Sequence, residues 1–302
     1  MLVNQRLFAT QPMTRFHIIT VVFFIFLLGC KKDTSEEVRD PKEQIVEDEA
    51  ALVTYLQTHF YNYEDFEAAP NDYSIRITLD TIADTNSDKT PLFDQVTSKW
   101  VDVTYKGEVI PHKLYYLVAR EGKGQNPTKV DSTYIRYTGN LLDGKSFDNR
   151  ETPIWFDLTS VVTGFREGVP YLKSGSYSVN SDGTFNFFDF GQGIIFMPSG
   201  LGYFDRAQGL VPQYAPLIFR ISLYTFNTAD HDGDGIPSML EDLDGDSNPF
   251  NDDTDSDGTS NMYDPDDDND GIPTAEEYDA DGDGIPDDKN DNGIPDYLDN
   301  TI

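Results

Sequence analysis

Alternating aspartates are the residues of this chain with the most recognisable chemistry, and they recur through residues 230–302. In the string Asp230-His-Asp232-Gly-Asp234-Gly-Ile, carboxylates stand at every second position and a glycine follows the last of them. Oxygens at this spacing can converge on one cation, and the glycine permits the sharp bend. Calcium suits such a flexible oxygen cage better than magnesium, which demands a stricter octahedron. The spacing therefore predicts structural calcium sites in this segment.

The same pattern continues along the segment. The window Asp266–Glu277 fits it through to the terminal glutamate, a third window ends in Asp264, and a fourth begins at Asp279. The windows follow one another too closely for the flanking helices of an EF-hand, and a proline follows the central ligand of several of them. In these two respects the segment resembles thrombospondin type 3 repeats. A solvated, disordered acidic tail is the alternative that composition alone favours. The expected ligands are Asp230, Asp232, Asp234, Ile236, Glu241, Asp253, Asp255, Asp257, Asp264, Asp266, Asp268, Asp270, Ile272, Glu277, Asp279, Asp281 and Asp283.

A second group of motifs lies between residues 113 and 228. Positions 137–148 read Tyr-Thr-Gly-Asn-Leu-Leu-Asp-Gly-Lys-Ser-Phe-Asp, positions 161–165 read Val-Val-Thr-Gly-Phe, and positions 210–212 read Leu-Val-Pro. Together these strings resemble the signature of FKBP-type peptidyl-prolyl cis-trans isomerases. The resemblance implies catalytic positions at Tyr137, Phe147, Asp148, Val161, Val162, Phe165, Tyr203 and Phe219, and further substrate contacts at Ile154, Leu210 and Val211.

The resemblance also implies catalysis without a cofactor or a covalent nucleophile. Rotation about an X-Pro amide crosses a barrier of about 18–20 kcal/mol because it breaks amide conjugation. An apolar pocket disfavours the planar, dipolar ground state more than the twisted one, and a few donors can hold the rotated carbonyl. In that family a backbone N–H, here that of Val162, binds the substrate carbonyl, and a tryptophan forms the floor, here replaced by Phe165. Ile154 stands where an aromatic wall residue is usual.

Apolar periodicity predicts the elements before these motifs. Apolar residues from Ile45 to Phe60 fall on one helical face, and those at 75–79 and 101–105 alternate as in strands. Residues 45–112 are therefore expected to form an α+β extension that packs against the following domain.

The segment that carries the motifs is rich in predicted strands. Residues 161–172 are its one helical candidate, and residues 217–226 form its last strand. Extra residues at 177–190 are expected to form a hairpin that could change access to the pocket. With the resemblance, the expected fold is α+β, with an FKBP-like antiparallel sheet wrapped on a short helix in residues 113–228. Residues 229–302 are expected to form the extended calcium-binding tail.

The N-terminus has the pattern of an export signal. Two arginines precede the apolar run 18–28, which is too short to span a bilayer comfortably and ends in Leu-Leu-Gly-Cys30. This ending resembles a bacterial lipobox, which implies that residues 1–30 are removed up to a lipidated Cys30 and that residues 31–44 form a tether. The expected location is the bacterial cell envelope, with a lipid anchor in the outer membrane facing the periplasm or the surface. A plain secretory signal with an incidental cysteine is the alternative.

Composition limits the partners. The formal charge is −32, of which residues 230–302 contribute −25, from 26 acidic residues and one lysine. Nucleic acid repels such a chain and is not an expected partner. The expected function is isomerisation of proline-containing exported polypeptides. The alternative is a non-catalytic FKBP-like lipoprotein that binds peptides or serves in adhesion and is stiffened by calcium.

Overall fold

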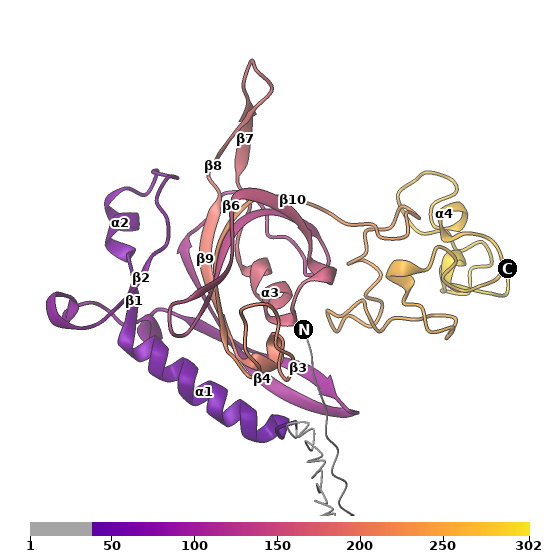
Figure 1. Cartoon of the computed structure of the whole chain (residues 1–302). Coiled ribbons are helices and arrows are strands. Elements are labelled where there is room, and N and C mark those ends of the chain that lie inside the picture. The colour runs from indigo at the N-terminus through magenta and orange to yellow at the C-terminus, as the bar shows by residue number, and fades with distance from the viewer. Residues whose placement is uncertain (1–37) are drawn as a thin grey trace, which may run out of the picture. The chain divides into compact units, whose positions relative to one another are not determined.

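A six-stranded antiparallel sheet, in the order β3-β4-β9-β10-β5-β6, forms the centre of the fold (Figure 1). The computed structural model describes residues 38–302. The expected export signal and Cys30 lie outside the described residues. The strands of this sheet are β3 (Thr97–Tyr105), β4 (Glu108–Arg120), β5 (Ser132–Leu141), β6 (Ser146–Asp157), β9 (Gly191–Met197) and β10 (Leu217–Asn227).

Apolar side chains cover both faces of this sheet because they alternate between two cores along each strand. On β9, Ile195 and Met197 belong to the first core, whereas Ile194 and Phe196 belong to the second. The first core packs against α3 (Thr163–Gly168), so the sheet wraps a short helix as expected. Burial on both faces also explains why β9 reads as a continuous apolar run and not as an alternating one.

The N-terminal segment closes the second core. Its first element, α1 (Pro41–Thr58), begins after Asp40, whose side chain accepts a hydrogen bond from the amide of Lys42 at 2.9 Å. Leu52 and Leu56 are fully buried in the second core, as the helical pattern predicts. The helix therefore packs against the side of the sheet opposite α3.

Two details of this segment differ from the expectation. Phe60 does not extend the helical face but lies in β1 (His59–Tyr61), because the helix ends one residue before this strand. Of the residues expected to form a strand at 75–79, only Leu79 lies in a strand. It begins β2 (Leu79–Thr81), which pairs with β1. The preceding residues run along the sheet without forming a ladder.

The expected division between residues 45–112 and 113–228 falls inside β4, which continues through position 112 without a break. Residues 97–112 therefore belong to the central sheet, while α1 and α2 (Tyr63–Ala68) pack on it. Of the helices in the described part of the chain, none is long and apolar enough to cross a membrane.

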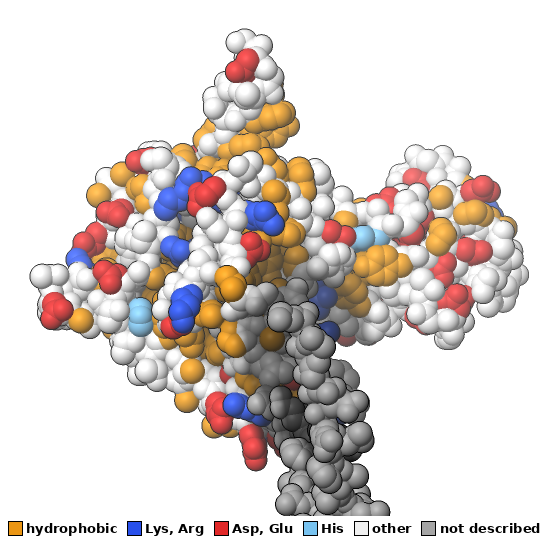
Figure 2. Space-filling view, viewed as in Figure 1, with side chains coloured by type: hydrophobic (Ala, Val, Ile, Leu, Met, Phe, Trp, Pro, Cys, Tyr) orange, Lys and Arg blue, Asp and Glu red, His pale blue; other side chains and the backbone are white. Residues whose placement is uncertain are grey.

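Residues 177–190 contain the expected hairpin. β7 (Ser176–Val179) pairs antiparallel with β8 (Phe185–Phe188) in a separate two-stranded sheet. The hairpin projects from the central sheet in Figure 1, and apolar side chains cover its base in Figure 2. Tyr177 and Phe185 are exposed on it.

The C-terminal segment, residues 228–302, is built from turns and short helices, of which α4 (Thr274–Glu277) is one. Aspartate side chains accept hydrogen bonds from amides two positions ahead, as Asp234 Oδ1 does from the amide of Ile236 at 2.7 Å. Gly235 has a φ of +100°, in the left-handed region that favours glycine. Acidic side chains are spread over the surface of this segment in Figure 2.

Candidate active site

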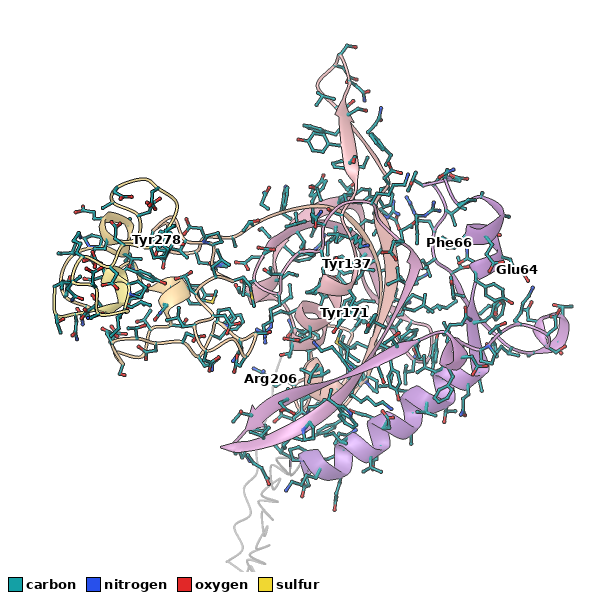
Figure 3. All side chains as sticks on the ribbon, turned by 180° about the vertical axis from the view of Figure 1, so that it is seen from behind. Glu64, Phe66, Tyr137, Tyr171, Arg206 and Tyr278 are labelled. Atoms are coloured by element: carbon teal, nitrogen blue, oxygen red, sulfur yellow. The ribbon has the colours of Figure 1, made fainter. Side chains whose placement is uncertain are left out.

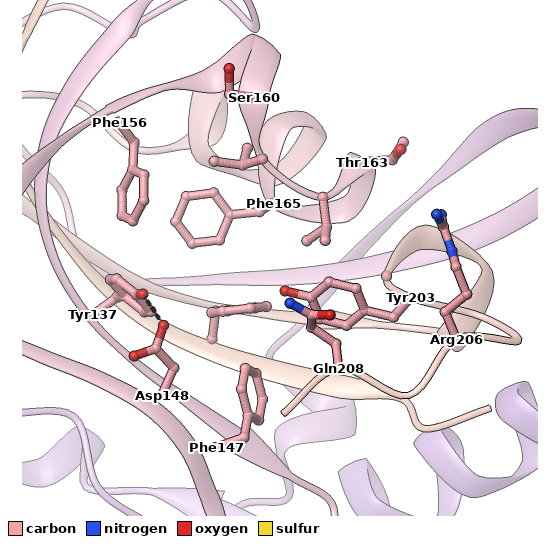
Figure 4. A pocket seen from close by; sticks show the side chains of 14 residues that line it. Tyr137, Phe147, Asp148, Phe156, Ser160, Thr163, Phe165, Tyr203, Arg206 and Gln208 are labelled. Carbon is pink, nitrogen blue, oxygen red and sulfur yellow. Dashed lines mark hydrogen bonds between the residues drawn. The ribbon is translucent and has the colours of Figure 1, made fainter. Parts of the chain in front are cut away.

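One cavity of about 590 Å³ collects all eight residues expected to be catalytic (Figure 4). It is formed by the turn before α3, by strands β5, β6 and β10, and by the loop after β9. Motifs that are far apart in the sequence therefore meet around it. Its lining residues are Tyr137, Phe147, Asp148, Phe156, Ser160, Val161, Val162, Thr163, Phe165, Gly202, Tyr203, Arg206, Gln208 and Phe219.

Aromatic rings form the floor and one wall of this cavity. The rings of Phe165 and Phe219 meet edge to face with centroids 5.0 Å apart, and Phe219 meets Phe147 in the same way at 5.5 Å. The ring of Tyr137 lies 6.0 Å from those of Phe165 and Phe219. Edge-to-face pairs at these separations attract one another beyond the burial of their area. The cavity therefore has a preorganised apolar surface, and Figure 3 shows Tyr137 inside the curve of the sheet.

Two glycines of the motifs allow this packing. A Cβ on Gly139 would lie 2.5 Å from Cζ of Phe147, so the Phe147 ring rests directly on the backbone of β5. A Cβ on Gly164 would lie 2.7 Å from Sδ of Met197, so α3 sits close against β9. Larger side chains at either position would push the cavity walls apart.

A polar pair lies among the rings. The hydroxyl of Tyr137 donates a hydrogen bond to the carboxylate of Asp148 (Figure 4). The guanidinium of Arg150 lies 4.0 Å from that carboxylate. Burial, and then the bond to Asp148, raises the pKa of Tyr137. Burial, and then the charge of Asp148, also raises the pKa of Tyr203. Both hydroxyls therefore stay protonated at neutral pH, and Asp148 fixes the direction of one of them.

The backbone before α3 offers a further donor. Val162 is the N-cap residue of α3, with a φ of −62° and a ψ of 145°. The first amides of a helix have no acceptor inside the helix. Within residues 38–302, no protein group accepts a hydrogen bond from the Val162 amide. Because Val162 lines the cavity, this amide can donate to the carbonyl of a ligand.

The loop that carries Tyr203 is held by the N-terminal helix. Asp48 of α1 accepts hydrogen bonds from the amide of Ser199 at 2.8 Å and from its hydroxyl at 2.7 Å. The side-chain amide of Gln44 donates to the other oxygen of Asp48 at 2.8 Å. Burial raises the pKa of Asp48. One wall of the cavity thus depends on a helix that lies outside the motifs.

Comparison with known proteins finds a family match within the segment that carries β5, β6 and α3. Residues 123–179 match the family model of FKBP-type peptidyl-prolyl cis-trans isomerase. The FKBP-type peptidyl-prolyl cis-trans isomerase FkpA of Aeromonas hydrophila is 34% identical over 124 residues, which cover 40% of this chain and 41% of the relative. The chain contains an FKBP-type peptidyl-prolyl cis-trans isomerase domain.

Two further relatives are similar to this chain. The outer membrane protein MIP of Legionella longbeachae is 30% identical over 125 residues, which cover 40% of this chain and 47% of that protein. The crystal structure of FkpA from Escherichia coli aligns over 62% of each chain with 23% identity and a TM-score of 0.34. The chain spans less than half of the length of the two sequence relatives, so the likeness concerns the FKBP-type domain.

Three expected substrate contacts do not line the cavity of the FKBP-type domain. Ile154 packs against the first core beside the cavity, and Val211 is buried in that core. Leu210 is 71% exposed. A bridge between Gln208 and Val211 places Leu210 at the tip of a tight turn, outside the lining of the cavity.

Phe156 supplies the aromatic wall that is missing at Ile154. Its ring lies 5.5 Å from that of Tyr137 and 6.1 Å from that of Phe165. Strand alternation could have identified it, because residues two apart on β6 share a face. The hairpin at 177–190 contributes no lining residue. Lining residues that no sequence pattern distinguished are Ser160, Thr163, Gly202, Arg206 and Gln208.

Outside the FKBP-type domain, carboxylates converge in the C-terminal segment. In each of four triads, one oxygen from every residue lies within 4.8 Å of the others. Three of these triads were expected as calcium ligands, and the fourth continues the same alternation between them. The triads are Asp230-Asp232-Asp234, Asp242-Asp244-Asp246, Asp253-Asp255-Asp257 and Asp266-Asp268-Asp270.

A fifth group joins two separate loops. Asp234 and Glu241 of the first loop meet Asp267 of a later one, and all of them are buried. Both carboxylate oxygens of Glu241, and both of Asp267, are buried without a hydrogen-bond donor. Burial, and then neighbouring carboxylates, raises the pKa of Glu241 to about 9 and that of Asp267 to about 8. The oxygens of this group suit a hard cation such as calcium. Asp267 was not predicted as a ligand, because it occupies a non-liganding position of its own loop.

The remaining expected ligands differ in burial, and Glu277 is buried among them. Ile236 is buried, whereas Ile272 is exposed. The side chains of Asp279 and Asp281 both accept a hydrogen bond from the amide of Asp283, at 2.9 and 3.0 Å. The window that begins at Asp279 therefore has the turn expected of a calcium loop, but Asp281 and Asp283 in it are exposed.

Proposed function

We propose that the FKBP-type domain catalyses cis–trans isomerisation of X-Pro bonds in exported polypeptides. The observation that supports the proposal most directly is the convergence of eight expected residues on one cavity. A prolyl ring packs on the floor made by Phe165 and Phe219, away from water that would compete for the amide carbonyl. The apolar floor disfavours the dipolar planar amide relative to the twisted one.

Donors at the rim of the floor complete the proposed mechanism. The Val162 amide binds a substrate carbonyl, and the hydroxyl of Tyr203 contacts the bound peptide. Tyr137 donates its hydroxyl hydrogen to Asp148 and contributes its ring to the apolar wall. Donors placed for the twisted state lower the barrier because they bind it better than the planar state. A reduction of about 4 kcal/mol corresponds to roughly a thousandfold in rate.

A protease-coupled assay on the full chain, with a peptide that contains one X-Pro bond, tests this proposal. We expect wild type to accelerate isomerisation and Phe147→Ala to lower kcat/KM at least tenfold. Trp155→Ala is the matched control, because Trp155 lies on the same strand but is 47% exposed and outside the cavity. Wild type that binds the peptide without accelerating isomerisation would instead support the non-catalytic alternative.

We further propose that the domain works in the bacterial cell envelope, anchored by lipid on Cys30. The export-signal pattern that ends at this cysteine supports the proposal, together with the similarity to a protein named as an outer membrane protein. Intact-mass measurement of the purified membrane form should show a mature N-terminus at Cys30 with acyl chains added. The variant Cys30→Ala should appear in the soluble fraction; retention of this variant in the membrane would exclude the anchor.

We also infer that the C-terminal segment binds calcium. The buried oxygens of Glu241 and Asp267 without donors support this inference. When bound, calcium would supply the positive charge that holds these carboxylates together, and it takes no part in isomerisation. The residues that would hold it are the triads named above with Glu241 and Asp267. Glu277, which is buried with one oxygen that has no donor, is a further candidate.

A further inference from the structure

A second cavity, of about 290 Å³, lies behind the sheet as seen from the isomerase site. On β10 it is lined by Arg220, Ile221 and Ser222. Tyr137 of β5 lines both cavities, but the three arginines of the second cavity do not line the first.

The cavity carries an excess of positive charge. Its charged lining residues are Arg76, Arg136 and Arg220 against the single carboxylate of Glu151, which gives a net charge of +2. This is unusual in a chain whose formal charge is −32. Thr78, Thr138, Ser146 and Asn149 add hydroxyl and amide groups to the lining.

Arg136 is the buried cation of this cavity, with 8% of its surface exposed. Its Nη2 donates to Oγ of Ser222 at 2.9 Å, and its guanidinium lies 5.6 Å from the ring centroid of Tyr224. Within residues 38–302 it forms no ion pair and no other hydrogen bond. Most of its donors are therefore left for another acceptor.

Arg120 shows what a satisfied arginine looks like on the same face of the sheet. It is as buried as Arg136, at 7% exposed. Its Nε donates to Gln192 Oε1 at 2.9 Å, and its two Nη atoms donate to the carbonyls of Pro70 and Asp72. Arg120 thus fastens the N-terminal segment to the sheet, a structural role that Arg136 does not share.

Arg220 and Arg76 also have donors that are not fully paired within the cavity. Arg220 donates to the carbonyl of Ile77 at 2.8 Å and to Asn140 Oδ1 at 3.0 Å, but its Nε is buried without an acceptor. Arg76 reaches Glu151 only at 4.0 Å, and both side chains are half exposed or more. The one carboxylate in the lining is therefore held at the open side.

We propose that this cavity binds a doubly charged tetrahedral oxyanion of the phosphate class. A buried guanidinium with no counter-ion and one hydroxyl partner is costly, and an anion between Arg136, Arg76 and Arg220 offsets that cost. Planar guanidinium groups match phosphate oxygens with paired, charge-assisted hydrogen bonds. A dianion also balances the net charge of the lining. Free phosphate and a phosphoryl ester share this chemistry.

Calorimetric titration of inorganic phosphate into the full chain tests the site, in calcium-free buffer with ionic strength held constant by chloride. Wild type should bind saturably, and Arg76→Gln and Arg136→Gln should each weaken binding at least tenfold. Glu151→Gln should tighten binding several-fold, because it removes the carboxylate that competes for the same arginines. Lys145→Gln is the control for loss of one exposed charge and should leave the affinity unchanged.

Two outcomes would overturn the site: no saturable binding to wild type, or equal affinity for wild type, Arg76→Gln and Glu151→Gln. Arg76 and Glu151 are at least half exposed, so Arg76→Gln and Glu151→Gln should fold and still measure phosphate affinity if Arg136→Gln does not fold. A parallel titration with glycerol phosphate separates the two sources of the anion. If glycerol phosphate binds more weakly than inorganic phosphate, the ligand is free phosphate; if it binds more tightly, the ligand is a phosphoryl ester. Isomerase activity should be unaffected by phosphate, so this proposal and the proposed function can fail independently.

Discussion

Asp48 on α1 accepts hydrogen bonds from both the amide and the hydroxyl of Ser199, which stands 151 positions later in the chain. The pair is shielded from water, because Asp48 is 2% exposed and Ser199 is fully buried. Ser199 begins the turn that leads to Tyr203 at the cavity wall. The N-terminal helix is thus part of the support of the ring-lined cavity and not an independent appendage.

Asp48→Ala should loosen this loop. The substitution leaves two buried donors of Ser199 without an acceptor, which should cost about 1–3 kcal/mol of unfolding free energy for each unsatisfied group. We expect faster hydrogen exchange of amides 199–204 and a lower kcat/KM for an X-Pro peptide. Glu47→Ala, which alters an exposed neighbour on the same helix, should change neither quantity. Unchanged exchange in Asp48→Ala would show that the loop holds itself.

Asp148→Asn should reduce activity without unfolding the domain. The asparagine keeps an oxygen for the Tyr137 hydroxyl but removes the charge that fixes its direction. Loss of a charge-assisted hydrogen bond should lower kcat/KM by about tenfold. The melting temperature should stay close to that of wild type, because Asp148 is not fully buried. Activity equal to wild type would remove Asp148 from the proposed machinery.

His112 should make the stability of the domain fall in acid. Burial lowers the pKa of His112 to about 4, and its Nδ1 is buried without a partner. An unfolded histidine has a pKa near 6.5, so the unfolded chain binds the proton first as the pH falls. The contribution of the neutral ring is present above pH 6.5 and is lost by about pH 4, a change of roughly 3 kcal/mol.

Denaturant titrations of wild type and His112→Gln from pH 7.5 to pH 4 check this expectation. The difference in unfolding free energy between the two proteins isolates the histidine, since the acidic segment titrates equally in both. The difference should shrink as the pH falls. A difference that stays constant across this range would mean that His112 takes up its proton as readily in the folded chain as in the unfolded chain.

Removal of calcium should expand the C-terminal segment. Without a cation, the buried carboxylates repel one another, so chelator should increase the radius of gyration measured by small-angle scattering. Glu241→Gln removes a buried ligand and should require more calcium for compaction. Glu276→Gln, at an exposed position, should behave as wild type. Scattering that is indifferent to millimolar calcium would contradict the proposed metal sites.

The parts of the fold that motifs specify could be predicted from the sequence. Tyr137, Phe147 and Asp148 lie on the two strands of one hairpin, β5 and β6, and the turn signal at Asp143-Gly144 marks where the chain reverses. Phe165 follows from the helix motif that α3 bears out. Local spacing was sufficient in both cases because each string folds on itself.

Other parts depend on contacts that a sequence does not display. Ile154 and Phe156 share one face of β6, and only the packing of the neighbouring rings shows that Phe156 forms the wall. The Asp48–Ser199 pair and the approach of Asp267 to Glu241 join residues far apart in the chain. Such pairings follow from tertiary packing and leave no local pattern.

The Val162 amide gives the most direct test of the claim that this cavity catalyses prolyl isomerisation. Substitution by proline removes the N–H donor without disturbing the backbone. The φ of −62° at Val162 is the value that proline prefers, and the extended conformation of Val161 is the one that proline favours before it. Val162→Ile keeps the amide and serves as the control.

Exchange spectroscopy by NMR, on a peptide with one X-Pro bond, measures catalysis at equilibrium without a protease. With a catalytic amount of the full chain, wild type and Val162→Ile should give cross peaks between the cis and trans resonances. Val162→Pro should exchange them at least tenfold more slowly while keeping the wild-type fold. Absence of exchange with wild type, or full activity in Val162→Pro, would contradict the account of this cavity as a prolyl isomerase site.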